Sequence, residues 1–109
     1  MFERRDTDKY LPLTESTYYV MLTLVEPLHG YAVMQKVEQI SRGTVKIGPG
    51  TLYGIFGTLE EASLIIKVKE ESRRKSYILT PKGKEVLARQ IERLGIMNGN
   101  GQSVMNRLQ

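Results

Sequence analysis

A glycine-rich face on one predicted helix is the first feature of this chain that suggests a chemical role. The helix starts at Gly48-Pro49, because proline at a first helical position needs no N–H donor and has its φ preset. Its polar side consists of glycines flanked by hydroxyl side chains: Gly50, Gly54, Gly57, Thr51, Tyr53 and Thr58. Each glycine in an exposed helix interior costs roughly 1 kcal/mol relative to alanine, so stability alone does not explain them. The face is either a poorly optimised solvent surface or that of a helix entering a DNA major groove by its N-terminus, at Pro49, Gly50 and Thr51.

A basic run, Arg73-Arg74-Lys75, is the second such feature. It lies between two stretches rich in β-branched and aromatic residues, 65–69 and 76–80, which predict a two-stranded hairpin. The basic run then sits at the hairpin tip. A charged run is usually a solvated turn, but directly after a helix-turn-helix it is predicted to touch DNA phosphates.

Residues suited to enzyme chemistry are scarce. The chain has no cysteine and one histidine, His29, which lies in a predicted turn and is interpreted as a turn or capping residue. The pairs Glu60-Glu61 and Glu70-Glu71 are sequence neighbours whose side chains diverge, which suits solvation better than acid–base work. No nucleophile–base set, phosphate loop or metal-ligand spacing occurs. We therefore expect no catalytic residue, no metal, no cofactor and no enzyme activity.

Length and charge set the remaining bounds. The chain has 109 residues, a formal charge of +4 and a pI of about 9.4, which predicts one domain and is compatible with an anionic partner. No run approaches the roughly 18 apolar residues of a membrane span, and the charged start does not resemble a secretory signal. We expect a soluble, cytoplasmic protein with no membrane partner.

The elements that position these groups follow from hydrophobic spacing. Helices are predicted over about 15–26, 30–41 and 49–62, with a loosely held arm over 1–12. Gly43 is placed to take the left-handed conformation that ends a helix, so the second and third helices form a helix-turn-helix candidate. The residues predicted to face inward are Tyr18, Met21, Leu22, Val25, Val33, Met34, Val37, Ile40, Leu52, Ile55, Phe56 and Leu59.

A last helix is predicted to begin at Thr80-Pro81, with Thr80 as N-cap. Its apolar stripe has no evident partner in the chain, and exposing it would forgo roughly 1.5–3 kcal/mol per side chain, so we expect a homodimer. The dimerisation residues are predicted to be Val86, Leu87, Ile91 and Leu94. Order is expected to about Met97; whether the helix continues to 108 or breaks near 98–101 is left open. The fold class is mainly α with a small β-hairpin (α+β): a winged helix-turn-helix over 1–80 and a C-terminal dimerisation helix over 81–109.

The motifs together closely resemble the PadR family of bacterial winged-helix transcriptional regulators, over residues 13 to about 94. The segments that carry the resemblance are 13–19, 28–31, 48–54, 73–77 and 79–83. It implies a dimer on a palindromic operator, usually a repressor relieved by a small molecule. This chain differs from the usual family pattern at three points. Gly57-Thr58 stands where basic residues are usual, and Ala62-Ser63 replaces a glycine turn before the hairpin, which is the wing of the winged helix. The chain also has no tryptophan.

The predicted sites combine the residue patterns with this resemblance. The DNA-binding residues are expected to be Tyr31, Pro49, Gly50, Thr51, Tyr53, Gly54, Thr58, Arg73, Arg74 and Lys75. Tyr18 and Tyr19 are the candidate surface for a small apolar or aromatic effector. The alternative functions are a winged-helix module that binds an acidic protein, and a ligand sensor without operator binding.

Overall fold

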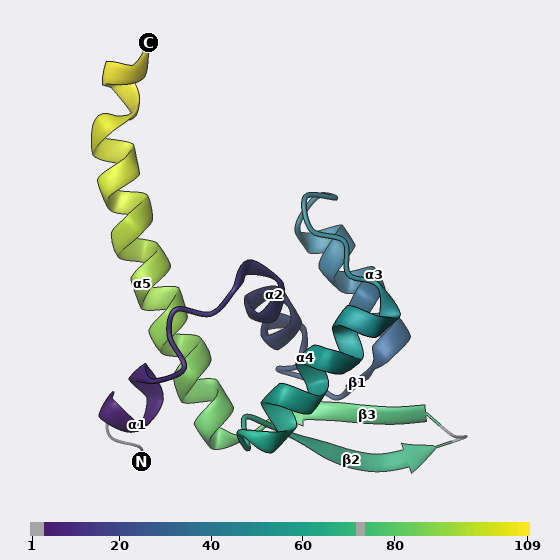
Figure 1. Cartoon of the computed structure of the whole chain (residues 1–109). Helices are drawn as coiled ribbons and strands as arrows, with labels where there is room; N and C mark the ends of the chain where they lie inside the picture. The colour runs from purple at the N-terminus through teal and green to yellow at the C-terminus, as the bar shows by residue number, and fades with distance from the viewer. Residues whose placement is uncertain (1–3, 72–73) are drawn as a thin grey trace.

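The computed structural model describes residues 4–71 and 74–109, with side chains from 6–68 and 74–109. Most of the chain is helical, with one small sheet, as the α+β prediction required. The elements are α1 (Arg4–Asp8), α2 (Glu15–Thr23), β1 (Leu28–His29), α3 (Gly30–Ile40), α4 (Pro49–Glu61), β2 (Ile65–Glu71), β3 (Arg74–Leu79), α5 (Pro81–Met105) and a 3₁₀ turn, η1 (Asn106–Leu108). Figure 1 shows α2, α3 and α4 grouped above the sheet, while α5 runs along one side and extends away from it.

The sheet has three antiparallel strands in the order β1-β3-β2. The β2–β3 hairpin matches the prediction and aligns Ile65 with Leu79. The prediction of a simple turn at 28–30 was wrong, because Leu28 and His29 pair with Tyr77 and Ser76 and add a third strand. A strand of two residues is too short to show a hydrophobic pattern in the sequence, so β1 can be identified only from its pairing with β3.

The hydrophobic core lies where α2, α3 and α4 meet the sheet and the first turns of α5. Its sixteen buried hydrophobic residues are Val20, Met21, Leu24, Val33, Val37, Val45, Ile47, Leu52, Phe56, Leu59, Leu64, Ile65, Tyr77, Leu79, Val86 and Leu87. The α4 prediction holds, since Leu52, Phe56 and Leu59 are buried and Ile55 is half-buried.

The predicted inward face of α2 is right at Met21, which is fully buried, but wrong at Val25. The helix ends at Thr23 rather than near Pro27, and Val25 is 54% exposed while Val20 and Leu24 are fully buried. α2 contacts both α3 and α5, so it buries two sides rather than one stripe. On α3, Ile40 is likewise 42% exposed, because it lies at the helix end. Gly43 has a φ of +77°, as predicted for the residue that ends α3.

The prediction for the N-terminal segment was also wrong. We expected a loose arm over 1–12, but from residue 4 onward it forms α1 and packs beside α5. Lys82 Nζ donates to the Tyr10 hydroxyl at 2.8 Å, and the Leu13 N–H donates to Gln90 Oε1 at 3.0 Å. The hydrogen bond from Lys82 lowers the pKa of Tyr10 below its usual value. Contacts with distant residues, which a local reading cannot detect, hold this segment in place.

Helix α5 is continuous from Pro81 to Met105, so no break occurs near 98–101. The Thr80 side chain accepts from the Gly83 N–H at 2.9 Å, which confirms the predicted N-cap. At Gly83, an added Cβ would collide with the Leu64 carbonyl, so α5 lies against the sheet edge only because this residue is glycine. The radius of gyration is 15.3 Å, whereas a compact chain of this length has about 13 Å. The projecting end of α5 accounts for the elongation.

Candidate nucleic-acid interface

Helix α4 presents two unlike faces. One is buried in the core, and the other leaves all the predicted groove residues exposed: Pro49, Gly50, Thr51, Tyr53, Gly54 and Thr58. A Cβ built at Gly50, Gly54 or Gly57 would meet no atom within 4 Å. Nothing described within the chain therefore requires glycine at these positions. The helix therefore carries an open outward surface of small residues.

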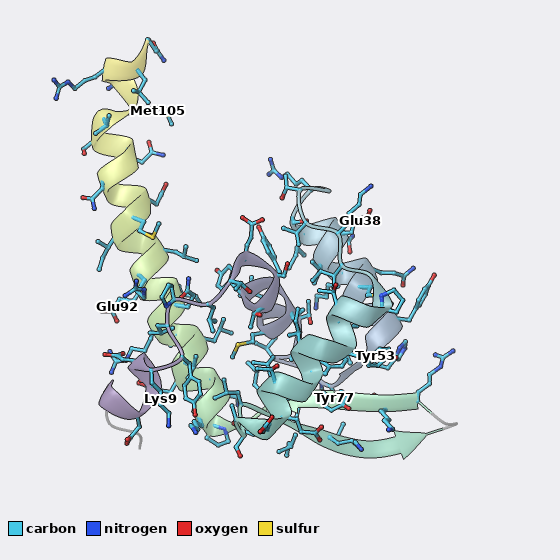
Figure 2. The ribbon with its side chains drawn as sticks, viewed as in Figure 1. Lys9, Glu38, Tyr53, Tyr77, Glu92 and Met105 are labelled. Atoms are coloured by element: carbon cyan, nitrogen blue, oxygen red, sulfur yellow. The ribbon has the colours of Figure 1, made fainter. Side chains whose placement is uncertain are left out.

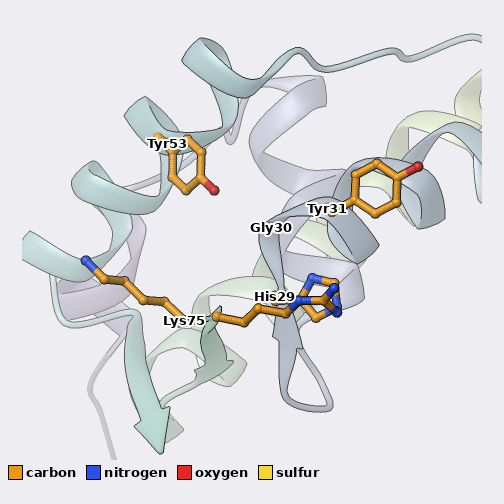
Figure 3. A pocket seen from close by; sticks show the side chains of 6 residues that line it. His29, Gly30, Tyr31, Tyr53 and Lys75 are labelled. Atoms are coloured by element: carbon orange, nitrogen blue, oxygen red, sulfur yellow. The ribbon is translucent and has the colours of Figure 1, made fainter. Parts of the chain in front are cut away.

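A cavity of about 440 Å³ joins the start of α3, the outer side of α4 and the first residues of β3. Figure 3 shows its lining residues, with the Tyr53 hydroxyl directed into the space between α4 and α3. The described residues that line it are His29, Gly30, Tyr31, Tyr53, Arg74 and Lys75. Four of the predicted DNA-binding residues thus gather on one surface, although they are up to 44 positions apart in the chain (Tyr31 to Lys75).

Tyr53 is held in place by neighbours on two elements. A Cβ added at Gly30 would lie 3.1 Å from the Tyr53 hydroxyl oxygen and 3.4 Å from Leu52 Cδ2. Gly30 therefore allows the Tyr53 ring to approach the first turn of α3. On its other side the ring meets Phe56 edge-on at 6.0 Å between centroids, and Phe56 in turn stacks on Tyr77 at 4.5 Å. Figure 2 labels Tyr53 and Tyr77, the two outer members of this aromatic row.

The tip end of the β2–β3 hairpin, which is the wing, supplies the positive charge of this surface. Arg74 and Lys75 begin β3 and are both exposed. Arg73, the third predicted member of the basic run, lies outside the described residues. Tyr31 and Tyr53 are 64% and 59% exposed, so aromatic groups with hydroxyl donors stand beside the cations. Cationic and hydroxyl groups together suit a polyanionic partner.

His29 is a lining residue for which the sequence predicted only a turn or capping role. It does cap α3, since its Nδ1 accepts from the Ala32 N–H at 3.5 Å. Its Nε2, however, lies 3.4 Å from Arg74 Nη1. The sequence signal was its place next to Tyr31, but the approach of Arg74 depends on the pairing of β1 with β3.

The predicted dimerisation stripe needs a partial correction. Val86 and Leu87 are 0% and 5% exposed and belong to the core of their own chain, so the premise that they lack an intrachain partner is wrong. The same helix face continues beyond the core at alternating steps of three and four residues. This exposed continuation, called the stripe from here on, consists of Leu94, Met97, Gly101, Val104 and Leu108. Of the two remaining predicted residues, Ile91 is 48% exposed and Leu94 half-buried.

The candidate effector residues lie on α2. The Tyr18 and Tyr19 rings meet edge-to-face with centroids 5.6 Å apart, and both side chains are half-buried. Burial raises the pKa of Tyr18 above its usual value, and the neighbouring Tyr19 adds to this.

Two other classes of site were sought. Within residues 4–71 and 74–109, no three His, Cys, Asp or Glu side chains group as a metal site would need. In the same ranges, no helix has both the length and the apolar character to cross a membrane.

The chain is similar in sequence to a family of known proteins and to individual known proteins. The family described as "Transcriptional regulator PadR-like family" matches residues 20–89. A 37.1 kDa uncharacterised protein of a Streptomyces fradiae transposon is 38% identical over 73 residues, which are 67% of this chain and 21% of that protein. The Escherichia coli transcriptional regulator YqjI is 34% identical over 59 residues, 54% of this chain and 28% of its own. The chain thus covers between a fifth and three tenths of these relatives.

A solved structure agrees with both the fold and the family. A PadR-like transcription factor from Bacteroides fragilis superposes with a TM-score of 0.69 and 28% identity, over 82% of this chain and 88% of that one. The family match covers β1, α3, α4 and the wing, which build the interface, and it extends into the start of α5. The chain therefore belongs to the PadR-like family of transcriptional regulators.

Proposed function

We propose that this chain is a sequence-specific DNA-binding repressor, which binds a palindromic operator as a homodimer and is released by a small apolar or aromatic effector. One observation carries the proposal best. One surface is bordered by the exposed face of α4, by Tyr31 at the start of α3, and by the basic residues at the tip end of the wing. A major groove accepts a helix, and the phosphates beside it accept cations and hydroxyl groups.

The α4 face would enter the groove by its N-terminal end. Gly50 and Gly54 leave room for base edges, and the Thr51 hydroxyl and Tyr53 ring are exposed beside them. Thr51 and Tyr53 would then discriminate between bases, with each wrong base pair costing on the order of 1–3 kcal/mol. Thr58 lies two turns further along and would stand near the groove edge.

The distal part of α5 would supply the dimer contact. Its Leu94, Met97 and Val104 continue the helix face that the core already uses, and they would pack on a second copy of the same face. A two-fold pair of this kind places two recognition helices on one side of the duplex, about 34 Å apart. The operator should then be an inverted repeat with half-sites about one helical turn apart, or a multiple of that.

Effector release is the least constrained part of the proposal. α2 carries Tyr18 and Tyr19 and contacts α5, so a planar ligand inserted beside their rings would act on the helix that joins the protomers. The repressing direction follows the family resemblance. Planar aromatic compounds should therefore change operator affinity and melting temperature together, because binding linkage is reciprocal. A broad screen in which neither quantity moves would count against Tyr18 and Tyr19 as an effector site.

The decisive experiment is a gel shift, at one fixed salt concentration, with the DNA upstream of the gene for this protein. Gly54→Leu should abolish operator binding by filling the groove side of α4, while the circular dichroism stays unchanged because nothing lies within 4 Å of that position. The matched control is Gly99→Leu, an equally open helical glycine on α5 and away from the stripe. Normal operator affinity in Gly54→Leu would show that α4 does not enter the groove.

The wing is tested by salt dependence. Arg74→Ala should weaken operator and random DNA about equally and flatten the slope of log K against log[salt] by about 0.9 per protomer. Arg42→Ala, an exposed arginine at the α3 end, serves as the matched control. If the Arg74 variant keeps the wild-type slope, that residue does not contact a phosphate.

A further inference from the structure

Gly30, the first residue of α3, is buried, although its own helix does not require a glycine there. Its φ is not in the positive range, unlike that of Gly43, so an ordinary side chain would be compatible with its backbone. Glycine is also a poorer helix former than alanine. The reason for glycine at this position therefore lies in a contact with another element.

That contact is with the tip of Tyr53 on α4. A Cβ at position 30 would lie 3.1 Å from the Tyr53 hydroxyl oxygen, which is closer than a carbon and an oxygen normally pack. The next neighbour, Leu52 Cδ2, would lie at 3.4 Å. Leu52 is fully buried, whereas Tyr53 is 59% exposed. An added methyl group would therefore displace the exposed hydroxyl and leave the core as it is.

The Tyr53 hydroxyl is available to a group outside the chain. No described residue forms a hydrogen bond with it. It is directed into the cavity that Arg74 and Lys75 also line (Figure 3). A tyrosine hydroxyl can donate and accept, so it can bind a base edge of either kind. Its position is set by Phe56 on one side of the ring and by the empty space at Gly30 on the other.

We propose that Gly30 is a positioning residue for DNA recognition, because its missing side chain leaves the space in which the Tyr53 hydroxyl reaches a base edge. This inference rests on the proposed DNA-binding function and adds to it a residue that does not itself touch the duplex. Gly30 then determines specificity, which is the ratio of operator affinity to random-duplex affinity. The affinity for DNA of any sequence depends instead on the phosphate contacts of other residues.

The experiment measures fluorescence anisotropy of labelled operator and random-sequence duplexes with Gly30→Ala, Tyr53→Phe and the double variant. Tyr53→Phe should lower the affinity ratio about tenfold per protomer, as expected for one lost base contact. Gly30→Ala should lower it by about threefold to tenfold. The melting temperature of Gly30→Ala should stay the same or rise, since alanine is the better helix former. Random-duplex affinity and its salt slope should not change, because no cation is lost.

The double variant separates positioning from any effect on α3 itself. Without the hydroxyl, the nearest atom of residue 53 to the added Cβ is the ring carbon Cζ at 3.5 Å, which is an ordinary contact. Gly30→Ala should therefore cause no further loss in the Tyr53→Phe background. The matched control is Gly99→Ala, a helical glycine on α5 with nothing within 4 Å of its added Cβ, which should keep the wild-type ratio.

Three outcomes would overturn this inference and leave DNA binding by the wild type intact. The first is an equal loss from Gly30→Ala in both backgrounds, and the second is an unchanged ratio in Tyr53→Phe or in folded Gly30→Ala. The third is an unfolded Gly30→Ala, which would make the contact a structural one. Failure of wild type to prefer its operator over the random duplex would instead remove the proposed function and this inference with it.

Discussion

The body of the molecule, residues 6–90, and the distal segment of α5, residues 91–105, are held in different ways. All sixteen buried hydrophobic residues lie in the body, the last of them Leu87. In the distal segment every residue is exposed except the half-buried Leu94. Figure 1 shows the distal segment standing clear of the other elements. The body is stabilised by its own contacts, whereas the distal segment presents an apolar stripe that no described part of the chain covers.

The distal segment has little to stabilise it as a helix on its own. A helix of this length that is marginal on its own becomes more so with Gly95, Gly99 and Gly101, each costing roughly 1 kcal/mol relative to alanine. The second copy of the stripe proposed above would offset that cost. Four measurements would test this contrast between the body and the distal segment.

The largest effect is expected in the body. Phe56 is 2% exposed and stacks between Tyr53 and Tyr77, so Phe56→Ala should lower the free energy of unfolding by about 3–5 kcal/mol. The matched control position is Ile96, which is 62% exposed and away from the stripe. Ile96→Ala should change the free energy of unfolding by less than about 0.5 kcal/mol. Urea unfolding followed by circular dichroism measures both. Comparable losses in the two variants would mean that the contrast is wrong.

The next effect concerns the dimer. Met97 and Ile96 are neighbours with 63% and 62% exposure, but only Met97 lies on the stripe. Met97→Asp should weaken dimerisation by about 3–6 kcal/mol, since each dimer loses two buried methionines. Ile96→Asp should leave the dimer intact. Sedimentation equilibrium at micromolar protein decides, and a folded wild-type monomer of 12.4 kDa would rule out the dimer and with it the palindrome.

A smaller effect should appear in amide hydrogen exchange. If a partner orders the distal segment, its amides should exchange about tenfold faster when the protein is diluted below the dimerisation constant. Amides in α4, which sits on the buried core, should show no such dependence. Mass spectrometry of peptides from both regions makes the comparison. Equal rates in the distal segment at all concentrations would indicate that the helix is stable without a partner.

The smallest effect concerns the attachment of α5 to the body. Lys82 Nζ donates to the Tyr10 hydroxyl at 2.8 Å and to the Ala62 carbonyl at 3.2 Å, so Lys82→Met should cost less than about 1 kcal/mol. The variant should also raise the pKa of Tyr10, which Lys82 lowers. Because the folded-state pKa is lowered, the additional stabilisation from ionised Tyr10 is fully present above about pH 10 and is lost as the pH falls through the lowered pKa. Absorbance titration of the tyrosines tests it, and an unchanged curve would place Lys82 away from Tyr10 in solution.

Several features of this protein were decided by local chemistry and could be predicted from the sequence. Pro49 and Pro81 mark the starts of α4 and α5, because a fixed φ and a missing N–H suit only the first turn of a helix. The two faces of α4 follow from the helical period. Gly43 takes a positive φ that other residues rarely adopt. The β-branched and aromatic residues of 65–69 and 76–80 likewise predicted the hairpin.

Tertiary contacts decided the remainder. The strand at Leu28 and His29 exists only because β3 pairs with it, and that pairing brings Arg74 to the His29 ring. The buried sides of α2 depend on helices from both sides, and the ordered N-terminal segment depends on Lys82 and Gln90, more than seventy positions away. The apolar face of α5 forms one continuous pattern in the sequence. In the structure, however, the body buries Val86 and Leu87 in the first turns of the helix and leaves the later part of that face exposed. Periodicity specifies which side of a helix is apolar, but only the position of the other elements specifies what covers it.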